Sequence, residues 1–154
     1  MEAQEPKVSN VMEDTVMAVD LNTSAKDCAS SMSKKGVSCS VVTQAGIAIG
    51  IVTERDLVSK VLAEALDPSK VLVRDIMSTP LITVAPTESI TEAAGLMSEY
   101  KVRRLIVVDG TGAMLGILTA GDLARHLAEK HGYKEPTLNA MARYKEGAGS
   151  GPYQ

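Results

Sequence analysis

The sequence has no tryptophan and no phenylalanine, and its four tyrosines are its only aromatic residues. The core must therefore consist of Val, Ile, Leu, Met and Ala side chains. Nucleic-acid binding by base stacking is also disfavoured, because there are almost no aromatic side chains on which bases could stack. No apolar run approaches the roughly 20 residues of a membrane-spanning helix. Residues 1–6 also lack the basic start and the apolar stretch of a secretory signal. We expect a cytoplasmic protein that makes no membrane contact.

A strong charge of one sign is also missing. The formal net charge is −3, and 45% of the 154 residues are apolar and 23% charged. These values are ordinary for a globular protein and exclude a bulk field that attracts nucleic acid. The two cysteines, Cys28 and Cys39, lie in apolar stretches, which predicts buried, reduced thiols. Together with the distant His126 and His131 they are too few for a metal site.

The sequence does contain an internal repeat with a shift of about 65 residues. One additional residue in a turn of the second copy raises the shift slightly near its end. A match over nearly the whole unit indicates a duplicated small fold with two copies, and not a solenoid. The clearest matches pair Met12 with Met77, Ser24 with Ser89, Thr53 with Thr119, and Asp56-Leu57 with Asp122-Leu123.

Each copy has the same predicted order of elements, β-α-β-β-α. An apolar stripe with helical spacing runs through Cys28 and Met32 in the first copy and through Ala93 and Met97 in the second. Strands are expected at 16–19, 40–42 and 47–52, and at 81–84, 105–108 and 114–118, with a closing helix from Thr53 or Thr119. The strands are apolar on both faces, so we expect each sheet to be covered on both sides.

The repeat boundaries predict four segments. Residues 1–7 form a flexible N-terminus, residues 8–67 the first repeat, residues 71–132 the second, and residues 133–154 a partly disordered C-terminal extension. Within that extension, residues 137–145 have the pattern of one short helix. The fold class is α/β (α+β), with two tandem repeats.

The motif Gly-Ile-Val-Thr-Glu-Arg-Asp-Leu at 50–57 returns as Gly-Ile-Leu-Thr-Ala-Gly-Asp-Leu at 116–123, each time after a strand. With the Val-Met and Ile-Met steps that precede each copy, this order resembles a pair of CBS domains, or Bateman module, over about residues 8–130. The resemblance implies that the two repeats pack sheet to sheet with pseudo-twofold symmetry. It also implies two equivalent clefts, which commonly bind adenine nucleotides or S-adenosyl compounds, and a homodimer of two such pairs.

The two Thr-x-x-Asp turns, Thr53 to Asp56 and Thr119 to Asp122, have two compatible interpretations. The Thr and Asp can form a helix-capping box, which is worth about 1 kcal/mol. Alternatively, as the resemblance implies, the carboxylate accepts hydrogen bonds from two ribose hydroxyls, while the Thr hydroxyl and the helix N-terminus favour ribose or phosphate.

By the geometry of the family, each site combines the turn of one repeat with the first strand and the start of the second strand of the other. The second copy has Arg103 and Arg104 at that start, which suit phosphate oxygens, unless they only solvate a strand edge. We therefore expect site A to bind phosphorylated nucleotides more tightly. Site A consists of Thr53, Asp56, Ile51, Leu81, Ile82, Arg103, Arg104 and Arg55, and site B of Thr119, Asp122, Ile117, Val16, Met17, Ser38 and Cys39.

Nothing in the sequence predicts an enzyme. No nucleophile–base pair stands out, and Gly110-Thr111-Gly112 lacks the Lys-Ser/Thr continuation of a phosphate-binding loop. We predict a regulatory module without a catalytic cofactor that binds AMP, ADP or ATP and reports its presence to a protein partner. The alternatives are a module for S-adenosyl compounds and a structural dimerisation module without a physiological ligand. Nucleic-acid binding through Lys101, Arg103, Arg104 and the C-terminal residues Arg143 to Lys145 is disfavoured by the net charge and the missing aromatics.

Overall fold

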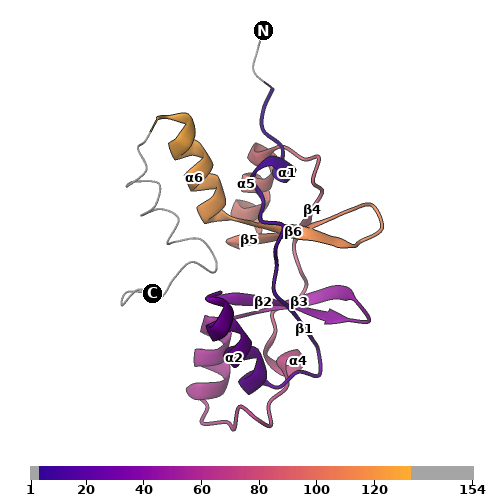
Figure 1. Ribbon diagram of the computed structural model, residues 1–154, viewed down its shortest axis with the longest axis vertical. Helices are drawn as coiled ribbons and strands as arrows, with labels where there is room; N and C mark the ends of the chain where they lie inside the picture. Colours follow the sequence, from indigo (N-terminus) through magenta and orange to yellow (C-terminus); the bar gives the residue numbers. More distant parts are fainter. Residues whose placement is uncertain (1–3, 133–154) are drawn as a thin grey trace. The chain divides into compact units, whose positions relative to one another are not determined.

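The computed structural model describes residues 4–132, which divide into two compact units (Figure 1). The first unit contains residues 16–81. The second contains residues 4–15 together with residues 82–132. No helix in this part of the chain combines the length and the apolar character that crossing a membrane requires. The predicted C-terminal extension, with its short helix at 137–145, lies outside the described residues.

The first unit has a three-stranded sheet in the order β1-β2-β3. Strand β1 is parallel to β2, and β2 is antiparallel to β3, with Val19 opposite Val42 and Val41 opposite Ile51. Ala45 and Gly46 form the β2–β3 turn with positive φ angles of 50° and 79°, as a tight hairpin requires. The elements are β1 Ala18–Asp20, α2 Ala25–Lys35, β2 Cys39–Gln44, β3 Ile47–Thr53, α3 Glu54–Leu57, the π-helical segment η1 Val58–Leu62, and α4 Val73–Ile76.

The second unit repeats this topology with the sheet order β4-β5-β6. Strand β4 is parallel to β5, and β5 is antiparallel to β6. The mixed α+β fold predicted from the repeat is therefore confirmed in both copies. The elements are α1 Val8–Val11, β4 Thr83–Val84, α5 Ile90–Tyr100, β5 Arg104–Val108, β6 Met114–Thr119 and α6 Ala120–Lys130.

Capping residues set the boundaries of the long helices α2 and α5. Ser24 and Ser89 cap α2 and α5, and each accepts a hydrogen bond of 3.1 Å from the backbone N–H three residues later. Helix α2 ends at Gly36, whose φ is 64°, whereas α5 ends at Lys101 in the same left-handed conformation, with φ 54°. The apolar stripe of each helix packs into the core of its own unit. The helices of each unit lie on one face of its sheet, so one unit by itself covers only that face (Figure 1).

The short helices α1 and α4 are equivalent in the repeat, yet each packs on the unit built from the other copy. Val8 of α1 is fully buried in the core of the second unit, with Val84, Leu105 and Leu118. Val73 and Ile76 of α4 belong to the core of the first unit. Residues 5–7 join α1 to helix α5 of the same unit, because the Glu5 carboxylate accepts hydrogen bonds from Thr91 and residues 7 and 89 form a β-bridge.

Two motif glycines make room for the segments that follow these short helices. Residue 13 pairs with Ile117 through two backbone hydrogen bonds of 2.9 Å, and Ser78 pairs with Ile51 in the same way, at 2.9 and 3.2 Å. A Cβ atom at Gly116 would collide with the Glu13 carbonyl, and a Cβ at Gly50 would lie 2.6 Å from the Met77 sulfur. The glycine of each Gly-x-x-Thr motif therefore permits a close backbone approach.

Candidate ligand-binding turns

The first Thr-x-x-Asp turn joins β3 to α3 in the first unit. The Thr53 hydroxyl accepts a hydrogen bond from the Asp56 N–H at 3.2 Å, and the Asp56 carboxylate accepts from the Thr53 N–H at 2.9 Å. The Thr53 hydroxyl also lies 3.1 Å from the same carboxylate oxygen. The capping interpretation is therefore confirmed here, with Asp in the place that Glu or Gln usually takes. The cap fixes the carboxylate rotamer at the start of the helix.

Sequence reasoning missed a further residue of this turn, Lys60. Its ammonium group lies 3.0 Å from the second oxygen of Asp56, and it donates a 2.9 Å hydrogen bond to the carbonyl oxygen of Ile76 at the end of α4. Asp56 is only 7% exposed, so the lysine supplies the counter-charge for a nearly buried carboxylate. The spacing of an acid and a lysine four residues later on a helix was the signal that could have revealed this pair.

The second turn joins β6 to α6 and has the same capping box. The Thr119 hydroxyl accepts from the Asp122 N–H at 3.1 Å, and the Asp122 carboxylate accepts from the Thr119 N–H at 2.9 Å. Thr119 and Asp122 are 3% and 2% exposed. His126 takes the place that Lys60 has in the first copy. Its Nε2 atom is buried and has no hydrogen-bond partner among residues 4–132.

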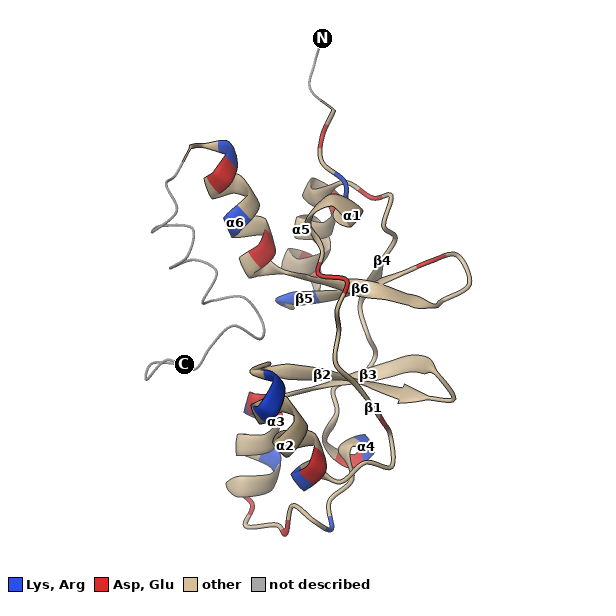
Figure 2. Ribbon diagram, viewed as in Figure 1, with Lys and Arg blue, Asp and Glu red and all other residues tan. Residues whose placement is uncertain are grey.

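The arginines Arg103 and Arg104 lie beside the second turn in their own unit. Arg104 is directly opposite Thr119 in the β5–β6 ladder, and the Arg103 carbonyl accepts a 2.9 Å hydrogen bond from the Ala120 N–H. The basic start of β5 and the acidic first turn of α6 are at the same end of the sheet (Figure 2). In the first unit the corresponding neighbours of Thr53 are Ser38 and Cys39.

The structure thus brings together part of each predicted site within one unit. Both predicted sites draw residues from the two units, so their complete composition stays a prediction. For site A, Thr53, Asp56, Ile51, Arg55 and Leu81 are in the first unit, and Ile82, Arg103 and Arg104 in the second. For site B, Thr119, Asp122 and Ile117 are in the second unit, and Val16, Met17, Ser38 and Cys39 in the first.

The remaining candidate groups are the two cysteines, any cluster of metal ligands and the residues that border a cavity. Cys28 and Cys39 are both buried and unbridged, as predicted, and burial raises the pKa of the Cys28 thiol, which makes it a poor nucleophile. Among residues 4–132, no three His, Cys, Asp or Glu side chains gather in a way that could hold a metal ion. Asp122 and His126 border a polar cavity of about 170 Å³, which α6 forms with α1.

The repeated strand-to-helix turns are characteristic of one family. A CBS domain family model matches residues 8–63 and again residues 73–129. The chain belongs to the CBS domain family. The "CBS domain-containing protein YhcV" of Bacillus subtilis is 32% identical over 117 residues, which are 76% of this chain and 82% of that protein. Archaeal relatives from Methanopyrus kandleri and Methanocaldococcus jannaschii are 41–43% identical over 58–61 residues, and the aligned part makes up about a third of each.

Solved CBS structures have the same fold. A putative signal-transduction protein with CBS domains from Burkholderia ambifaria superposes with a TM-score of 0.76 at 28% identity, and the match covers 84% of this chain and 98% of that one. The CBS domain pair of protein MJ0100 gives a TM-score of 0.74 at 25% identity, covers 82% and 99%, and was solved in complex with 5′-methylthioadenosine and S-adenosyl-L-methionine. CBS pairs are often ligand-binding regulatory modules, and stand-alone examples are generally regulatory and not catalytic.

Proposed function

We propose that this CBS pair is a regulatory sensor that binds adenine nucleotides through its two Thr-x-x-Asp turns and signals to a protein partner. The observation that carries the proposal is the capped carboxylate at the start of a helix in both copies. A carboxylate has two oxygens with about four lone-pair sites, so Asp56 can accept a ribose hydroxyl in addition to its contacts with Thr53 and Lys60. Because the cap fixes its rotamer, little side-chain entropy is lost when the ligand binds.

Phosphate recognition is assigned to Arg103 and Arg104, in site A with Thr53 and Asp56. The guanidinium groups offer charge-assisted hydrogen bonds, which are worth about 1.5–3 kcal/mol each. Site B has Ser38 and Cys39 at the corresponding positions and no cation there. Site A therefore prefers AMP, ADP or ATP, and site B a neutral or cationic adenosine compound.

Isothermal titration calorimetry with AMP tests both parts of this proposal. Asp56→Asn keeps an oxygen for the cap and removes the charge, so we expect at least about tenfold weaker AMP binding, which corresponds to about 1.4 kcal/mol. Arg104→Ala should also weaken AMP, while Asp122→Asn should leave the tighter site intact. Unchanged binding in Arg104→Ala with lost binding in Asp122→Asn would reverse the assignment. The absence of uptake of any adenosine compound at millimolar concentration would refute nucleotide sensing altogether.

S-adenosyl compounds are a second candidate ligand, because the MJ0100 CBS pair was solved with S-adenosyl-L-methionine. Such a ligand carries a sulfonium cation in place of phosphate, so it suits site B, which has Ser38 and Cys39 at the positions that Arg103 and Arg104 have in site A. Competition calorimetry separates the two classes: AMP and S-adenosyl-L-methionine that bind independently occupy different sites. If each displaces the other with full stoichiometry, they share one site, and the division into A and B is wrong.

Homodimer formation is proposed from an exposed apolar surface on the first unit. Val58 and Leu62 of η1 are 56% and 75% exposed, and Leu66 after it is 48% exposed. Leucine and valine side chains in such a stripe favour burial against a second protein surface. Light scattering should give twice the chain mass for the wild type and a monomer for Leu62→Glu. A monomeric wild type would refute the proposal, and Ile47→Glu, an exposed residue in the β2–β3 hairpin of the same unit, serves as the matched control.

A further inference from the structure

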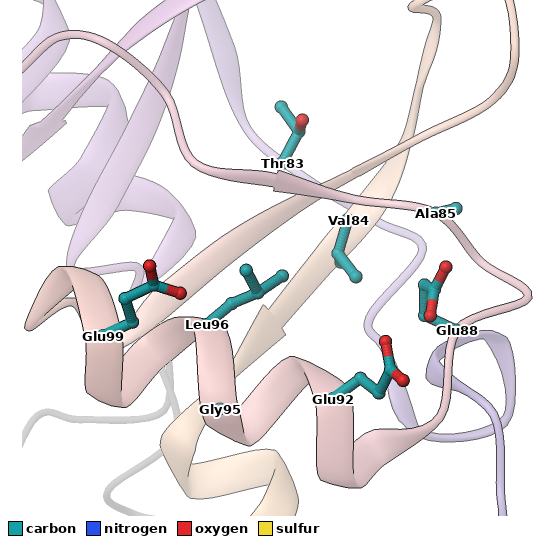
Figure 3. Close-up of a pocket in the computed structure, with 8 residues that line it drawn as sticks. All are labelled: Thr83, Val84, Ala85, Glu88, Glu92, Gly95, Leu96 and Glu99. Carbon is teal, nitrogen blue, oxygen red and sulfur yellow. The ribbon is translucent and has the colours of Figure 1, made fainter.

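An open groove of about 500 Å³ runs along strand β4 and helix α5 in the second unit (Figure 3). Its floor includes Val84 and Leu96, which supply apolar surface. Glu88, Glu92 and Glu99 line it, and their carboxylates point to the side of the helix on which β4 lies (Figure 3). We call this feature the β4 groove. All of its residues belong to one unit and none to the two turns described above.

The strand beside the groove is the edge of its sheet and has hydrogen-bonding groups directed outward. Among residues 4–132, strand β4 stands at the end of the sheet order β4-β5-β6 and pairs with β5. In a parallel ladder, alternate residues use their backbone groups toward the partner strand. Ile82 accepts from the Ile106 N–H at 3.1 Å, and Thr83 is paired with Ile106 in register, so the Thr83 N–H and C=O face away from β5. An edge of this kind is a template for one more strand.

Gly95 indicates that the groove is kept open beyond what folding requires. It lies in the middle of α5 and is exposed. A glycine there costs about 1 kcal/mol relative to alanine. A Cβ atom at this position would meet no heavy atom within 4 Å, so packing of the unit does not demand the glycine. A side chain at position 95 would instead project toward the groove that Gly95 lines.

The other copy provides an internal comparison. The residues equivalent to Glu88, Glu92 and Glu99 are Thr23, Asp27 and Lys34, and the residue equivalent to Gly95 is Ser30. The repeat therefore builds the same strand and helix twice but places three acids and a helix-interior glycine in one copy only. The acidic groove is not a consequence of the fold itself.

We propose that the β4 groove binds an extended segment of a partner protein that carries lysine or arginine at alternate positions and adds a strand to β4. Strand addition uses the outward Thr83 backbone, while the basic side chains on one face of the segment meet the Glu side chains. The aliphatic stems of the same basic side chains cover Val84 and Leu96, which line the same groove, while the residues at the intervening positions point to the opposite face of the sheet. This proposal specifies the partner of the proposed sensor as a protein with a basic, extended segment. Binding of that segment at the groove does not depend on adenosine binding.

Charge complementarity is the argument for a basic segment. The neighbouring Glu88 carboxyl, through a hydrogen bond and through its like charge, raises the pKa of Glu92, and the charge of Glu5 adds to this effect. A cationic partner relieves this repulsion, so its binding favours the ionised form of Glu92. An acidic or neutral segment would leave the repulsion in place.

The test uses the full chain without nucleotide and three labelled, end-capped hexapeptides, with binding measured by fluorescence anisotropy. The first alternates lysine and valine, the second glutamate and valine, and the third lysine and proline. Proline keeps the charge but removes the backbone donors of a ladder. We expect the lysine–valine peptide to bind with a dissociation constant below about 1 mM and the other two to bind at least about tenfold more weakly. Amide chemical-shift changes should centre on Thr83 and Gly95.

Two variants and a control complete the test. Glu92→Gln with Glu99→Gln should weaken the lysine–valine peptide at least about tenfold, and Gly95→Leu should block the groove. The matched control, Asp27→Asn with Glu64→Gln, removes the same charge from the first unit and should leave binding unchanged. Binding that survives Glu92→Gln with Glu99→Gln, or that is equally strong for the lysine–proline peptide or for spermidine, would overturn the added strand. A failure of nucleotide binding would leave these results untouched, so the two proposals fail separately.

Discussion

The Lys60 ammonium group lies 3.0 Å from the Asp56 carboxylate, and His126 has the equivalent position relative to Asp122. The two turns share a backbone and a capping box but differ in the side chain four residues after the acid. In the first turn this side chain ends in an ammonium group, and in the second it is an imidazole ring. The two copies therefore present their carboxylates in different electrostatic surroundings.

Replacing Lys60 by methionine should lower the free energy of unfolding. The variant loses the ion pair with Asp56 and the hydrogen bond to the Ile76 carbonyl, and it leaves a nearly buried carboxylate without its counter-charge. Because the lysine side chain is partly exposed, we expect a loss of about 0.5–1.5 kcal/mol in urea unfolding. Lys35→Met, at the exposed end of α2, is the control and should change stability little. Equal stability of Lys60→Met and Lys35→Met would show that the pair contributes nothing.

Alanine at the two motif glycines should destabilise the protein to different extents. At position 116 the added Cβ collides with the carbonyl oxygen of Glu13. Residue 13 cannot move without breaking the two hydrogen bonds that its backbone N–H and C=O form with Ile117. At position 50 the colliding atom is the sulfur of Met77, near the end of a flexible side chain. We expect Gly116→Ala to cost about 2–3 kcal/mol and Gly50→Ala less. Urea midpoints measure both, and the opposite order would contradict the close approach as the reason for these glycines.

Much of the fold could be predicted because the repeat shows each pattern twice. A helical stripe through Cys28 and Met32 is convincing when Ala93 and Met97 follow it at the same shift. The capping box was predictable for a similar reason, since both copies have Thr followed by Asp three residues later after an apolar strand. These are local features, and local patterns carry information on secondary structure.

The remainder depends on contacts between distant residues. Helices α1 and α4 have four residues each, too few for a periodic pattern, and the sequence does not say on which unit Val8 or Val73 packs. The bond from Lys60 to the Ile76 carbonyl joins residues 16 apart. The β4 groove was missed because its three acids are widely spaced in and just before a helix with an ordinary amphipathic pattern. Only the structure shows that they lie beside the same strand edge.

Asp109 should make stability depend on pH in the acid range. Its carboxylate accepts hydrogen bonds from the Thr111 hydroxyl at 2.6 Å and from the Thr111 and Ala113 N–H groups at 2.8 and 3.0 Å. These bonds hold the pKa of Asp109 below its usual value. The folded state therefore binds this proton less tightly than the unfolded state, so the stabilisation is present above the usual aspartate pKa, near 4, and is lost as the pH falls through the lowered value.

Asp109→Ala is accordingly expected to be less stable than the wild type at pH 7, and the difference should shrink as the pH falls below about 4. Urea unfolding at a series of pH values measures it. Asp14→Ala provides the comparison, because Asp14 is exposed and accepts a long hydrogen bond of 3.4 Å from the Thr15 hydroxyl. If the difference in unfolding free energy between Asp109→Ala and the wild type stays constant down to low pH, the stability of the β5–β6 hairpin does not depend on the ionised Asp109 carboxylate.

Glu92 should have the opposite effect, because Glu88 raises its pKa. The folded state binds this proton more tightly than the unfolded state, so the favourable contribution is complete below the usual glutamate pKa, near 4.3, and is lost as the pH rises through the raised value. Glu92→Gln removes the repulsion. The variant should therefore be more stable than the wild type at pH 7 and indistinguishable from it in acid. Glu99→Gln, which keeps the Glu88–Glu92 pair, should not show this gain. If it does, the repulsion involves the whole groove, and if neither variant gains stability, the Glu88–Glu92 repulsion is too weak to require a cationic partner.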